Sequence, residues 1–506
     1  MSDEFTALQR QSTWTLVPND SSRNVLGCKW IYRTKFNPDG SVALYKARLV
    51  ALGCRQQFGL DYFHTFSPVA KLPTIRIFLT VAVSFHWQVL QLDVSNAFLH
   101  GALNETVYMS QPPGFKDTVH PDYVCLLHKS LYGLKQSPRQ WFDTFSNYLL
   151  QFGFHHSTAD PPLLIYTKQS VLIYILVYVD DILLTGNDNA TITCLLTALS
   201  SKFQMKNLGR ISHFLGMHVS HTSQGLHLSQ AAYATQILQR DGMSACKPIS
   251  SPIPTKLVTE TDTSSLALST ADSDLFRHLI GSLQYLTVTR PDITFTVNRL
   301  CQHMHCPQQS DFKLLKRLLR YLKGTLSFGI PITATDLQLH AYSDSDWAGD
   351  PADRKSTTGY CAFLGSNLIS WQVKKQKTVA RSSTEAEYRA LATATTDIIW
   401  LRRLLKEFSI PTSAPTVLLC DNISSIALAN NPIFRARTKH IEIDFHFVRE
   451  CIKNKLITVS YIHTVDQLAD LFTKPLSIPR FQFLRDKLHI SEANVSLRGG
   501  DKPAVL

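Results

Sequence analysis

A nine-residue apolar run at 171–179 dominates the hydrophobic pattern of this 506-residue chain. Two adjacent carboxylates, Asp180 and Asp181, end the run, and a second apolar run at 182–184 follows at once. Short apolar runs on both sides of a polar pair predict a buried β-hairpin with an acidic turn. The run is too short to cross a bilayer, which takes about 20 residues.

A third carboxylate, Asp93, follows the apolar and β-prone stretch 87–92. The end of one strand and the turn of a hairpin can meet side by side in one sheet. Three oxygen ligands without Cys or His favour Mg²⁺ or Mn²⁺ over zinc. Two such ions roughly 3.5–4 Å apart are the usual device for in-line attack at phosphorus. The alternative for Asp180 and Asp181 is a solvent-facing turn, in which the pair has no chemical role.

Alternating residues predict a second hairpin between Lys29 and Ala51, with its turn at Asn37-Pro-Asp-Gly40. Lys46 and Arg48 are two residues apart and therefore share one face of its second strand. Such a pair suits a nucleotide triphosphate, with Lys as a point charge and Arg as a fork. The residues alone favour the simpler interpretation, a solvated basic face.

Two helices are predicted from capping and periodicity. Ser137 is expected to cap the first in a capping box with Gln140, and its core face comprises Trp141, Phe145 and Leu149. The second helix covers 311–323, with leucines on one face and Lys and Arg on another, which suits nucleic-acid phosphates, a membrane surface or calmodulin. The Ser-, Thr- and Asp-rich stretch 255–274 is predicted to be a linker.

The C-terminal third alternates strands and helices in the order β-β-β-α-β-α-β. The predicted strands are 339–347, 357–364, 368–373, 417–421 and 456–462, and the long helix is 382–408. Asp344, Asp346 and Asp421 lie at strand ends, and Asp470 lies on a final short helix. Asp344 and Asp346 share one strand face, so their spacing does not separate them.

The long helix carries two glutamates with different expected roles. Glu385 fits a capping box with Ser382 and precedes Arg389 by four residues, which gives it a structural role. Glu387 lies in the stripe that should face the sheet, where an unpaired carboxylate is costly. That stripe contains Ala390, Leu391, Ala394 and Ile398. Glu387 is therefore the predicted metal ligand.

The formal net charge of +12 suits a polyanionic partner. Ten cysteines without Cys-x-x-Cys spacing indicate reduced thiols in the cytosol or nucleus. The N-terminus lacks the basic and apolar regions of a signal peptide.

Several short motifs lie along the chain from about Trp14 to about Leu476. They include Gly27-Cys-Lys-Trp30, Tyr45-Lys-Ala-Arg-Leu-Val-Ala51, Leu92-Asp-Val-Ser-Asn-Ala-Phe98, Leu131-Tyr-Gly-Leu-Lys-Gln136, Tyr178-Val-Asp-Asp181, Tyr321-Leu-Lys-Gly324 and Ala469-Asp-Leu-Phe-Thr-Lys-Pro475. In combination these motifs specifically resemble those of copia-type LTR-retrotransposon Pol polyproteins, in their reverse transcriptase and RNase H portion.

The resemblance implies an α+β fold. A right-hand polymerase with fingers, palm and thumb would precede an RNase H-like α/β domain with a five-stranded mixed sheet. The implied boundaries are 1–254 for the reverse transcriptase with its primer-grip region, 255–335 for a linker and helical connection, 336–476 for the RNase H-like domain and 477–506 for a C-terminal tail.

The resemblance also implies roles for the polymerase residues. Asp93, Asp180 and Asp181 would be the catalytic metal ligands, and Lys46 and Arg48 would grip the incoming triphosphate. Phe98 would lie beside the sugar and exclude a 2′-hydroxyl, although the residues alone allow a core Phe equally. Gln136 would lie along the nascent base pair.

In the RNase H-like domain the implied ligands are Asp344, Glu387, Asp421 and Asp470. The family's Tyr-Ser-Asp wording selects Asp344 over Asp346. The expected cofactors are Mg²⁺ or Mn²⁺, two per active site.

The function implied is RNA- and DNA-directed DNA polymerase activity joined to RNA:DNA-hybrid ribonuclease activity. The expected partners are an RNA template, a DNA primer, their hybrid, dNTPs and the capsid, protease and integrase parts of a polyprotein, with no membrane. The expected location is a cytoplasmic virus-like particle or the nucleus.

Two alternatives stay open. The chain starts at Met1 just before the polymerase motifs, so it fits a fragment of a decayed element that only binds nucleic acid. The tripeptide Asp344-Ser-Asp346 also fits the Asp-x-Asp motif of nucleotide-sugar glycosyltransferases, although about one such match arises by chance in a chain of this size.

Overall fold

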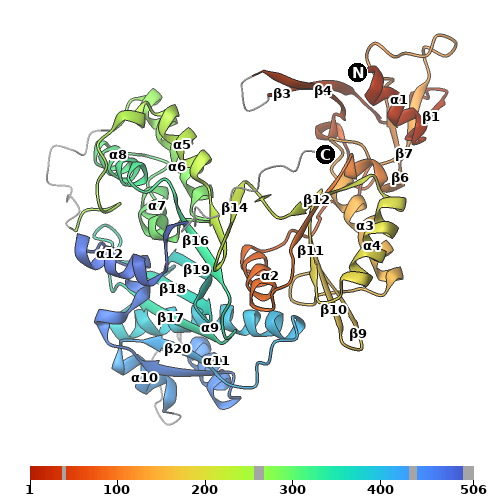
Figure 1. Ribbon diagram of the computed structural model, residues 1–506. Coiled ribbons are helices and arrows are strands. Elements are labelled where there is room, and N and C mark those ends of the chain that lie inside the picture. Colours follow the sequence, from red (N-terminus) through yellow and green to blue (C-terminus); the bar gives the residue numbers. More distant parts are fainter. Residues whose placement is uncertain (37–40, 256–266, 432–441, 494–506) are drawn as a thin grey trace, which may run out of the picture. The chain divides into compact units, whose positions relative to one another are not determined.

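The computed structural model describes residues 1–36, 41–255, 267–431 and 442–493. Contacts divide the chain into two compact units, which Figure 1 shows in sequence colours. Unit 1 comprises 1–70 and 89–210, and unit 2 comprises 71–88 and 211–506. The predicted turn at 37–40 lies outside the described residues. The predicted domain boundaries stay predictions.

A six-stranded sheet forms the palm of unit 1, in the order β12-β5-β11-β10-β9-β8. Its strands are β5 (Leu90–Val94), β8 (His155–His156), β9 (Leu163–Lys168), β10 (Val171–Tyr178), β11 (Asp181–Gly186) and β12 (Met205–Arg210). Helices α3 (Ser137–Phe152) and α4 (Asn189–Lys202) cover one face of it (Figure 1). The shared core includes the predicted Trp141, Phe145 and Leu149, which are all buried.

The predicted acidic hairpin is confirmed. Strands β10 and β11 pair antiparallel, with Tyr178 opposite Asp181. Val179 turns the chain with a φ of 58°, in the left-handed region. Its carbonyl accepts a hydrogen bond of 2.6 Å from the indole Nε1 of Trp141, which ties the turn to helix α3.

Unit 1 also contains two smaller sheets. The predicted second hairpin is the ribbon of β3 (Cys28–Phe36) and β4 (Val42–Ala51). A four-stranded sheet has the order β1-β7-β6-β2. Its strands are β1 (Trp14–Val17), β2 (Val25–Leu26), β6 (Ala102–Met109) and β7 (Val124–Lys129), and helix α1 (Ser2–Arg10) precedes them.

The capping prediction for α3 is wrong. The N-cap is Gln136, whose side chain makes no cap bond, and Ser137 is the first helical residue. The Ser137 hydroxyl donates instead to the carbonyl of Leu131 at 2.6 Å. This hydrogen bond directs the hydroxyl toward the preceding turn, and Ser137 lies inside the helix instead of capping it.

Unit 2 contains an antiparallel sheet in the order β13-β14-β15-β16-β22, with helices beside it. Its strands are β13 (His213–Phe214), β14 (Met217–Thr222), β15 (Gly225–Ser229), β16 (Phe328–Thr333) and β22 (Ser491–Glu492). The helices are α5 (Ala231–Arg240), α6 (Thr270–Leu286), α7 (Thr294–Cys301), α8 (Gln309–Lys323) and α12 (Ile478–Lys487). Helix α12 and strand β22 thus occupy the segment predicted as a C-terminal tail.

The linker prediction is wrong at its C-terminal end, because α6 begins at Thr270 with Ser269 as its N-cap. Residues 256–266 lie outside the described residues. Helix α8 buries its predicted leucine face and exposes Lys313 and Lys316. Arg317 and Arg320 of its basic face bond to a segment before α6, at Ser251 Oγ and the carbonyl of Lys247.

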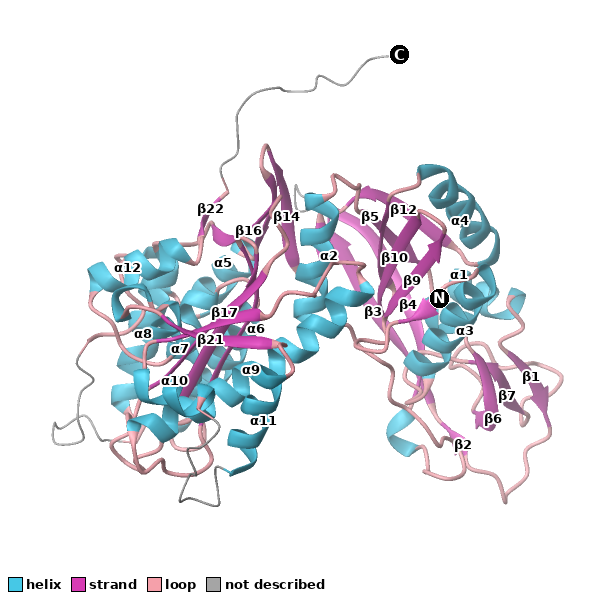
Figure 2. Ribbon diagram, turned by 90° about the horizontal axis from the view of Figure 1, so that it is seen from below, coloured by secondary structure: helices cyan, strands magenta, loops and turns pink. Residues whose placement is uncertain are grey.

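The predicted five-stranded mixed sheet is confirmed, in the order β19-β18-β17-β20-β21. Strands β17 and β20 are parallel, as are β20 and β21, whereas β17, β18 and β19 are antiparallel. The strands are β17 (Leu339–Ser345), β18 (Thr357–Leu364), β19 (Asn367–Lys375), β20 (Thr416–Cys420) and β21 (Ile457–Tyr461). Helix α9 (Ser383–Glu407) contacts β17, β18 and helix α11 (Glu442–Lys453), and α10 (Ile423–Asn430) follows β20 (Figure 2).

Helix α2 (Leu72–Ser84) joins unit 2, although both its neighbours in sequence belong to unit 1. It contacts β16 and β19, and nine of its thirteen residues are buried. Among the described residues, the structure contains no helix with the length and apolarity that crossing a membrane requires.

Candidate functional site

Two carboxylates of the palm meet across neighbouring strands. Asp93 on β5 lies directly opposite Asp181 on β11, and Asp180 lies in the turn beside them. The carbonyl of Asp180 accepts a hydrogen bond from the amide of Val94 at 3.3 Å. This bond joins the acidic turn to the strand end that carries Asp93, so the backbone holds all three residues at one sheet edge.

The electrostatics of this cluster are unfavourable without a cation. Asp181 is half-buried, and burial, followed by repulsion from Asp180 and Asp93, raises its pKa to about 6. No Lys or Arg among the described residues forms an ion pair with any of the three carboxylates. A bound cation would relieve this repulsion, and the oxygen-only ligand set suits Mg²⁺ or Mn²⁺.

An aromatic contact connects the predicted nucleotide-binding residues. The guanidinium of Arg48 lies 4.6 Å from the centre of the Tyr132 ring, in a cation–π contact. Tyr132 also meets Phe98 edge to face, with ring centres 5.1 Å apart. Burial is the main cause that raises the pKa of Tyr132, and Asp180 and Asp93 add to it. Tyr132 thus lies between Arg48, Phe98 and the palm carboxylates.

Backbone contacts hold Tyr132 in this place. Its carbonyl accepts from the amide of Ala51 at the end of β4, at 2.8 Å. The next residue, Gly133, has a φ of 92°, and a Cβ there would lie 2.2 Å from the carbonyl oxygen of Ala51. Only glycine allows this close approach. Tyr132 lies within the Leu131-Tyr-Gly-Leu-Lys-Gln136 motif, but nothing in its local sequence predicts these contacts.

The other predicted nucleotide contacts differ in environment. Lys46 is half-buried on β4 and shares a strand face with Arg48. Phe98 lies in the short 3-10 helix Ala97–His100 and packs partly against the palm core. Gln136 is fully buried, and its side chain accepts from Gln56 at 2.9 Å and donates to the carbonyl of Asp61 at 2.8 Å.

A second carboxylate cluster lies in the mixed sheet of unit 2. Asp344 comes from β17, Glu387 from α9, and Asp421 directly follows β20. Burial, followed by repulsion from Asp344 and Asp421, raises the pKa of Glu387 well above its ordinary value. Its Oε2 atom is buried without any hydrogen-bond partner. An orphaned buried carboxylate oxygen beside two other carboxylates fits a cation site.

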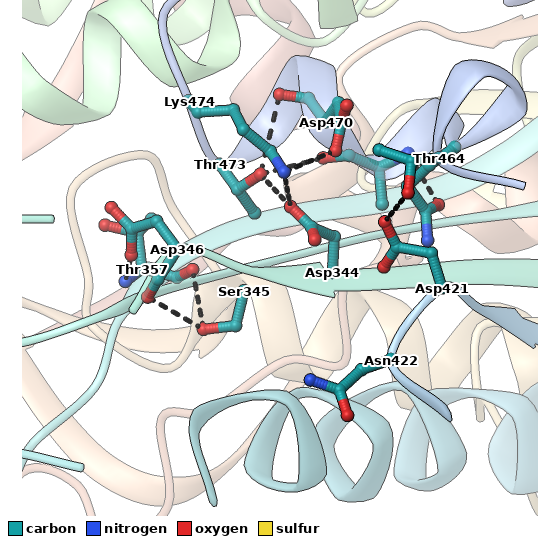
Figure 3. A network of polar contacts seen from close by, with 12 residues as sticks. Asp344, Ser345, Asp346, Thr357, Asp421, Asn422, Thr464, Asp470, Thr473 and Lys474 are labelled. Carbon is teal, nitrogen blue, oxygen red and sulfur yellow. Dashed lines mark hydrogen bonds and ion pairs between the residues drawn. The ribbon is translucent and has the colours of Figure 1, made fainter. Parts of the chain in front are cut away.

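Asp470 joins this cluster from the short 3-10 helix Leu468–Phe472, together with two cations. Lys474 Nζ lies 2.8 Å from Asp470 and 3.4 Å from Asp344, and Arg480 lies 3.2 Å from Asp470. Figure 3 shows Lys474 and Thr473 directed toward Asp344. The hydroxyl of Thr473 donates to Asp344. The fold therefore neutralises one side of the cluster with its own cations.

Asp344 and Asp346 share a strand face but have different partners. Asp346 accepts from the amide of Thr357, and Figure 3 shows it apart from the other carboxylates. Asp344 contacts Thr473 and Lys474 and repels Glu387. The geometry therefore supports Asp344 rather than Asp346 as the ligand.

Glu385 makes the structural contacts that its sequence position suggests. The hydroxyl of Ser382 accepts from the Glu385 amide at 3.2 Å, and Arg389 donates to the Glu385 carboxylate at 2.6 Å. The reciprocal cap bond comes from the Arg381 amide, one residue earlier than a capping box requires.

A cysteine, Cys420, also lies beside this carboxylate cluster. The ligand atoms of Glu387, Cys420 and Asp421 all lie within 4.8 Å of one another. No other three His, Cys, Asp or Glu side chains within the described part of the chain meet this limit, the palm carboxylates included. The only sequence signal for Cys420 is that it immediately precedes Asp421.

Comparison with known proteins identifies the family of this chain. Residues 11–255 match the family described as "Reverse transcriptase (RNA-dependent DNA polymerase)". The chain is 47% identical over 503 residues to a retrovirus-related Pol polyprotein from transposon RE2 of Arabidopsis thaliana, covering 99% of this chain and 34% of that protein. It therefore spans about a third of the length of this relative.

Two further similarities differ in weight. A putative transposon Ty5-1 protein of Saccharomyces cerevisiae is 32% identical over 302 residues, which cover 59% of this chain and 97% of that protein. A solved foamy viral protease-reverse transcriptase in complex with RNA/DNA hybrid matches 94% of this chain and 55% of its own, with 13% identity and a TM-score of 0.48, too weak to support any conclusion. The sequence similarities show that this chain belongs to the copia-type retrotransposon Pol polyproteins, of which it spans the reverse transcriptase and RNase H portion.

Proposed function

We propose that this chain is an RNA- and DNA-directed DNA polymerase joined to a ribonuclease that cuts the RNA of RNA:DNA hybrids. The observation that carries the polymerase assignment is the meeting of Asp93 and Asp181 across paired strands, with Asp180 in the adjoining turn. Membership of the reverse transcriptase family supports the same assignment.

The polymerase residues have separable roles in this proposal. Asp93, Asp180 and Asp181 hold Mg²⁺ or Mn²⁺, which supplies the positive charge that stabilises the attacking and leaving oxygens of an in-line displacement. Lys46 and Arg48 bind the triphosphate of the incoming nucleotide. Phe98 lies beside its sugar, and Tyr132 positions both Arg48 and Phe98 through its two ring contacts.

The ribonuclease residues are Asp344, Glu387, Asp421 and Asp470. Their carboxylates hold divalent ions, which supply the charge and the activated water for hydrolysis of RNA. Lys474 stabilises the cluster before ions bind, because it pairs with both Asp344 and Asp470. We extend the proposal to the expected partners and location: template, primer, dNTPs and the other polyprotein parts, in a virus-like particle or the nucleus.

Primer extension tests the polymerase assignment. Purified protein should extend a DNA primer on an RNA template only when Mg²⁺ or Mn²⁺ is present. Asp180→Asn should abolish extension and leave hybrid binding nearly unchanged. The matched control is Asp143→Asn, since Asp143 makes only a surface ion pair with Arg139 in the same unit. Normal extension by the Asp180 variant would overturn the assignment, and binding without any extension by the unaltered protein would favour a decayed nucleic-acid-binding protein.

Hybrid cleavage tests the ribonuclease assignment and separates the two aspartates of β17. Asp344→Asn should abolish cleavage of the RNA strand, whereas Asp346→Asn should retain it, because Asp346 bonds to the Thr357 amide instead of the cluster. Gel analysis of labelled RNA in a hybrid measures both. The reverse result would transfer the ligand role to Asp346.

A further inference from the structure

A thiol lies inside the carboxylate cluster of the RNase H-like domain. Cys420 is the last residue of β20 and is fully buried. Its sulfur and one carboxylate oxygen each from Glu387 and Asp421 all lie within 4.8 Å of one another. The sulfur accepts a weak hydrogen bond from the amide of Asn422 at 3.4 Å. The thiol therefore faces the same space as the two carboxylates.

Two independent features indicate that this space suits a cation. Glu387 is only 6% exposed, and its Oε2 atom is buried without a hydrogen-bond partner. The built-in cations Lys474 and Arg480 form ion pairs with Asp344 and Asp470, and neither forms an ion pair with Glu387 or Asp421. Asp421 accepts a hydrogen bond from Thr464 at 2.9 Å and interacts with the charge of Lys474 over a longer distance. The least compensated carboxylate is therefore Glu387, on the side of the cluster where Cys420 lies.

The Cys420 thiol determines which cations could bind to Glu387, Cys420 and Asp421 at the same time. Mg²⁺ takes oxygen ligands, so Cys420 contributes nothing to a magnesium site. Zn²⁺ and Cd²⁺ bind thiolate sulfur readily alongside carboxylate oxygen. A tetrahedral zinc ion with sulfur at about 2.3 Å and oxygen at about 2.0 Å holds these ligands roughly 3.5 Å apart. The three ligand atoms, which lie within 4.8 Å of one another, would move closer to reach that separation.

We propose that Glu387, Cys420 and Asp421 form a binding site for a thiophilic divalent cation, of the class of Zn²⁺ and Cd²⁺. The Cys420 sulfur bonds to the ion and its proton leaves to solvent, while each carboxylate contributes one oxygen. Water takes the fourth position. Because two ligands are shared with the proposed ribonuclease site, such an ion displaces Mg²⁺ and blocks RNA cleavage; this consequence, but not the binding itself, rests on the proposed function.

Cadmium titration of the full-length chain under reducing-agent-free, metal-free conditions tests the binding site. Sulfur-to-cadmium charge transfer absorbs in the ultraviolet, so each thiolate ligand adds absorbance. The chain contains ten cysteines, so the comparison is between variants. Cys420→Ser should remove the absorbance of roughly one tight equivalent. The matched control is Cys361→Ser, because Cys361 is equally buried in strand β18 of the same sheet and belongs to no such cluster among the described residues.

A second variant keeps every thiol in place. Glu387→Gln removes a carboxylate ligand and should weaken the tight cadmium equivalent by about tenfold or more. Circular dichroism shows whether Cys420→Ser folds. If it does not fold, cadmium binding by Glu387→Gln tests the proposed site instead. Cadmium absorbance unchanged in both variants would overturn the proposal. Failure of Mg²⁺-dependent cleavage with intact cadmium binding would instead refute the proposed ribonuclease.

Discussion

At the residue scale, the hydrogen-bond and ion-pair partners of an acidic side chain, rather than its residue type, distinguish a structural from a functional role. Glu385 and Glu387 lie two residues apart on one helix and are both buried. Glu385 has a cap bond and an ion pair with Arg389, whereas one oxygen of Glu387 has no partner. An uncompensated buried carboxylate costs stability, so its persistence is typical of a functional site.

The first prediction concerns the stability cost of Asp181 in metal-free protein. Burial and two neighbouring carboxylates raise its pKa to about 6 from the ordinary 3.8, so the folded state favours the protonated form. Protonation of Asp181 therefore stabilises the folded state at low pH, and this contribution to the free energy of unfolding is lost as pH rises through about 6. At pH 7 in a chelator, Asp181→Asn should therefore unfold at a higher temperature than the unaltered protein. The gap should narrow as pH falls below 6 and close only near the ordinary pKa of 3.8, where the carboxyl is protonated in both states. A pH-independent gap would contradict this account.

The second prediction concerns sugar selection by Phe98. Its ring lies edge-on to Tyr132, which fixes its position near the palm carboxylates. Phe98→Ala should admit ribonucleotides more readily, because the clash with a 2′-hydroxyl is removed. The ratio of steady-state incorporation of dNTP to rNTP measures this. An unchanged ratio would make Phe98 a core residue only. Tyr132→Phe is the control, since it retains the ring contact and should retain discrimination.

At the element scale, helix α2 packs into the core of unit 2, although unit 1 precedes and follows it in the sequence. Its Arg76 is buried and donates to the carbonyls of Ile369 at 3.0 Å and Val288 at 2.7 Å. The guanidinium also lies 3.9 Å from the centre of the Trp371 ring. These contacts join α2 to β19 and to the end of α6, so α2 forms part of the core of unit 2.

The third prediction follows from these contacts. Arg76→Ala should lower the free energy of unfolding of unit 2 by about 2–5 kcal/mol, because it leaves a cavity and removes the donor to the carbonyls of Ile369 and Val288. Denaturant unfolding of the full chain measures the loss. Arg403→Ala is the control, since Arg403 is exposed on α9 and should change stability by less than about 0.5 kcal/mol. Equal effects of the two variants would show that α2 contributes little to unit 2.

At the scale of the whole molecule, each compact unit contains one carboxylate cluster. Asp93, Asp180 and Asp181 lie in unit 1, whereas Asp344, Glu387, Asp421 and Asp470 lie in unit 2. No ligand is shared between the two clusters. The two proposed activities should therefore respond to substitution independently.

The fourth prediction tests this independence. Glu387→Gln should remove RNA cleavage and spare primer extension, while Asp180→Asn should do the reverse. Glu385→Gln is the control for the helix, and its cost should be limited to about 0.5–2 kcal/mol of stability, since it loses cap and ion-pair contacts only. Loss of cleavage in the Glu385 variant together with normal cleavage in the Glu387 variant would reverse the assignment of the two glutamates.

The sequence by itself determined the elements whose hydrophobic pattern is clear. A continuous apolar run ended by two carboxylates predicted the palm hairpin, because a strand buried on both faces is apolar throughout. The order of strands and helices, with its resemblance to the RNase H fold, predicted the mixed sheet. The capping position gave Glu385 its structural contacts, whereas the ligand role of Glu387 stays a prediction. The start of α3 was wrong because its cap depends on the carbonyl of Leu131, which no local pattern shows.

Only the tertiary structure decided which side chains meet across the fold. Asp344 and Asp346 share a strand face, so their different partners come from Thr357 and Thr473 on other elements. Tyr132 and Cys420 contact residues from segments that are distant in sequence. Helix α2 belongs to unit 2, although the residues on both sides of it in the sequence belong to unit 1. The physical reason is that periodicity reports which face of an element is buried, whereas long-range packing determines what that face contacts.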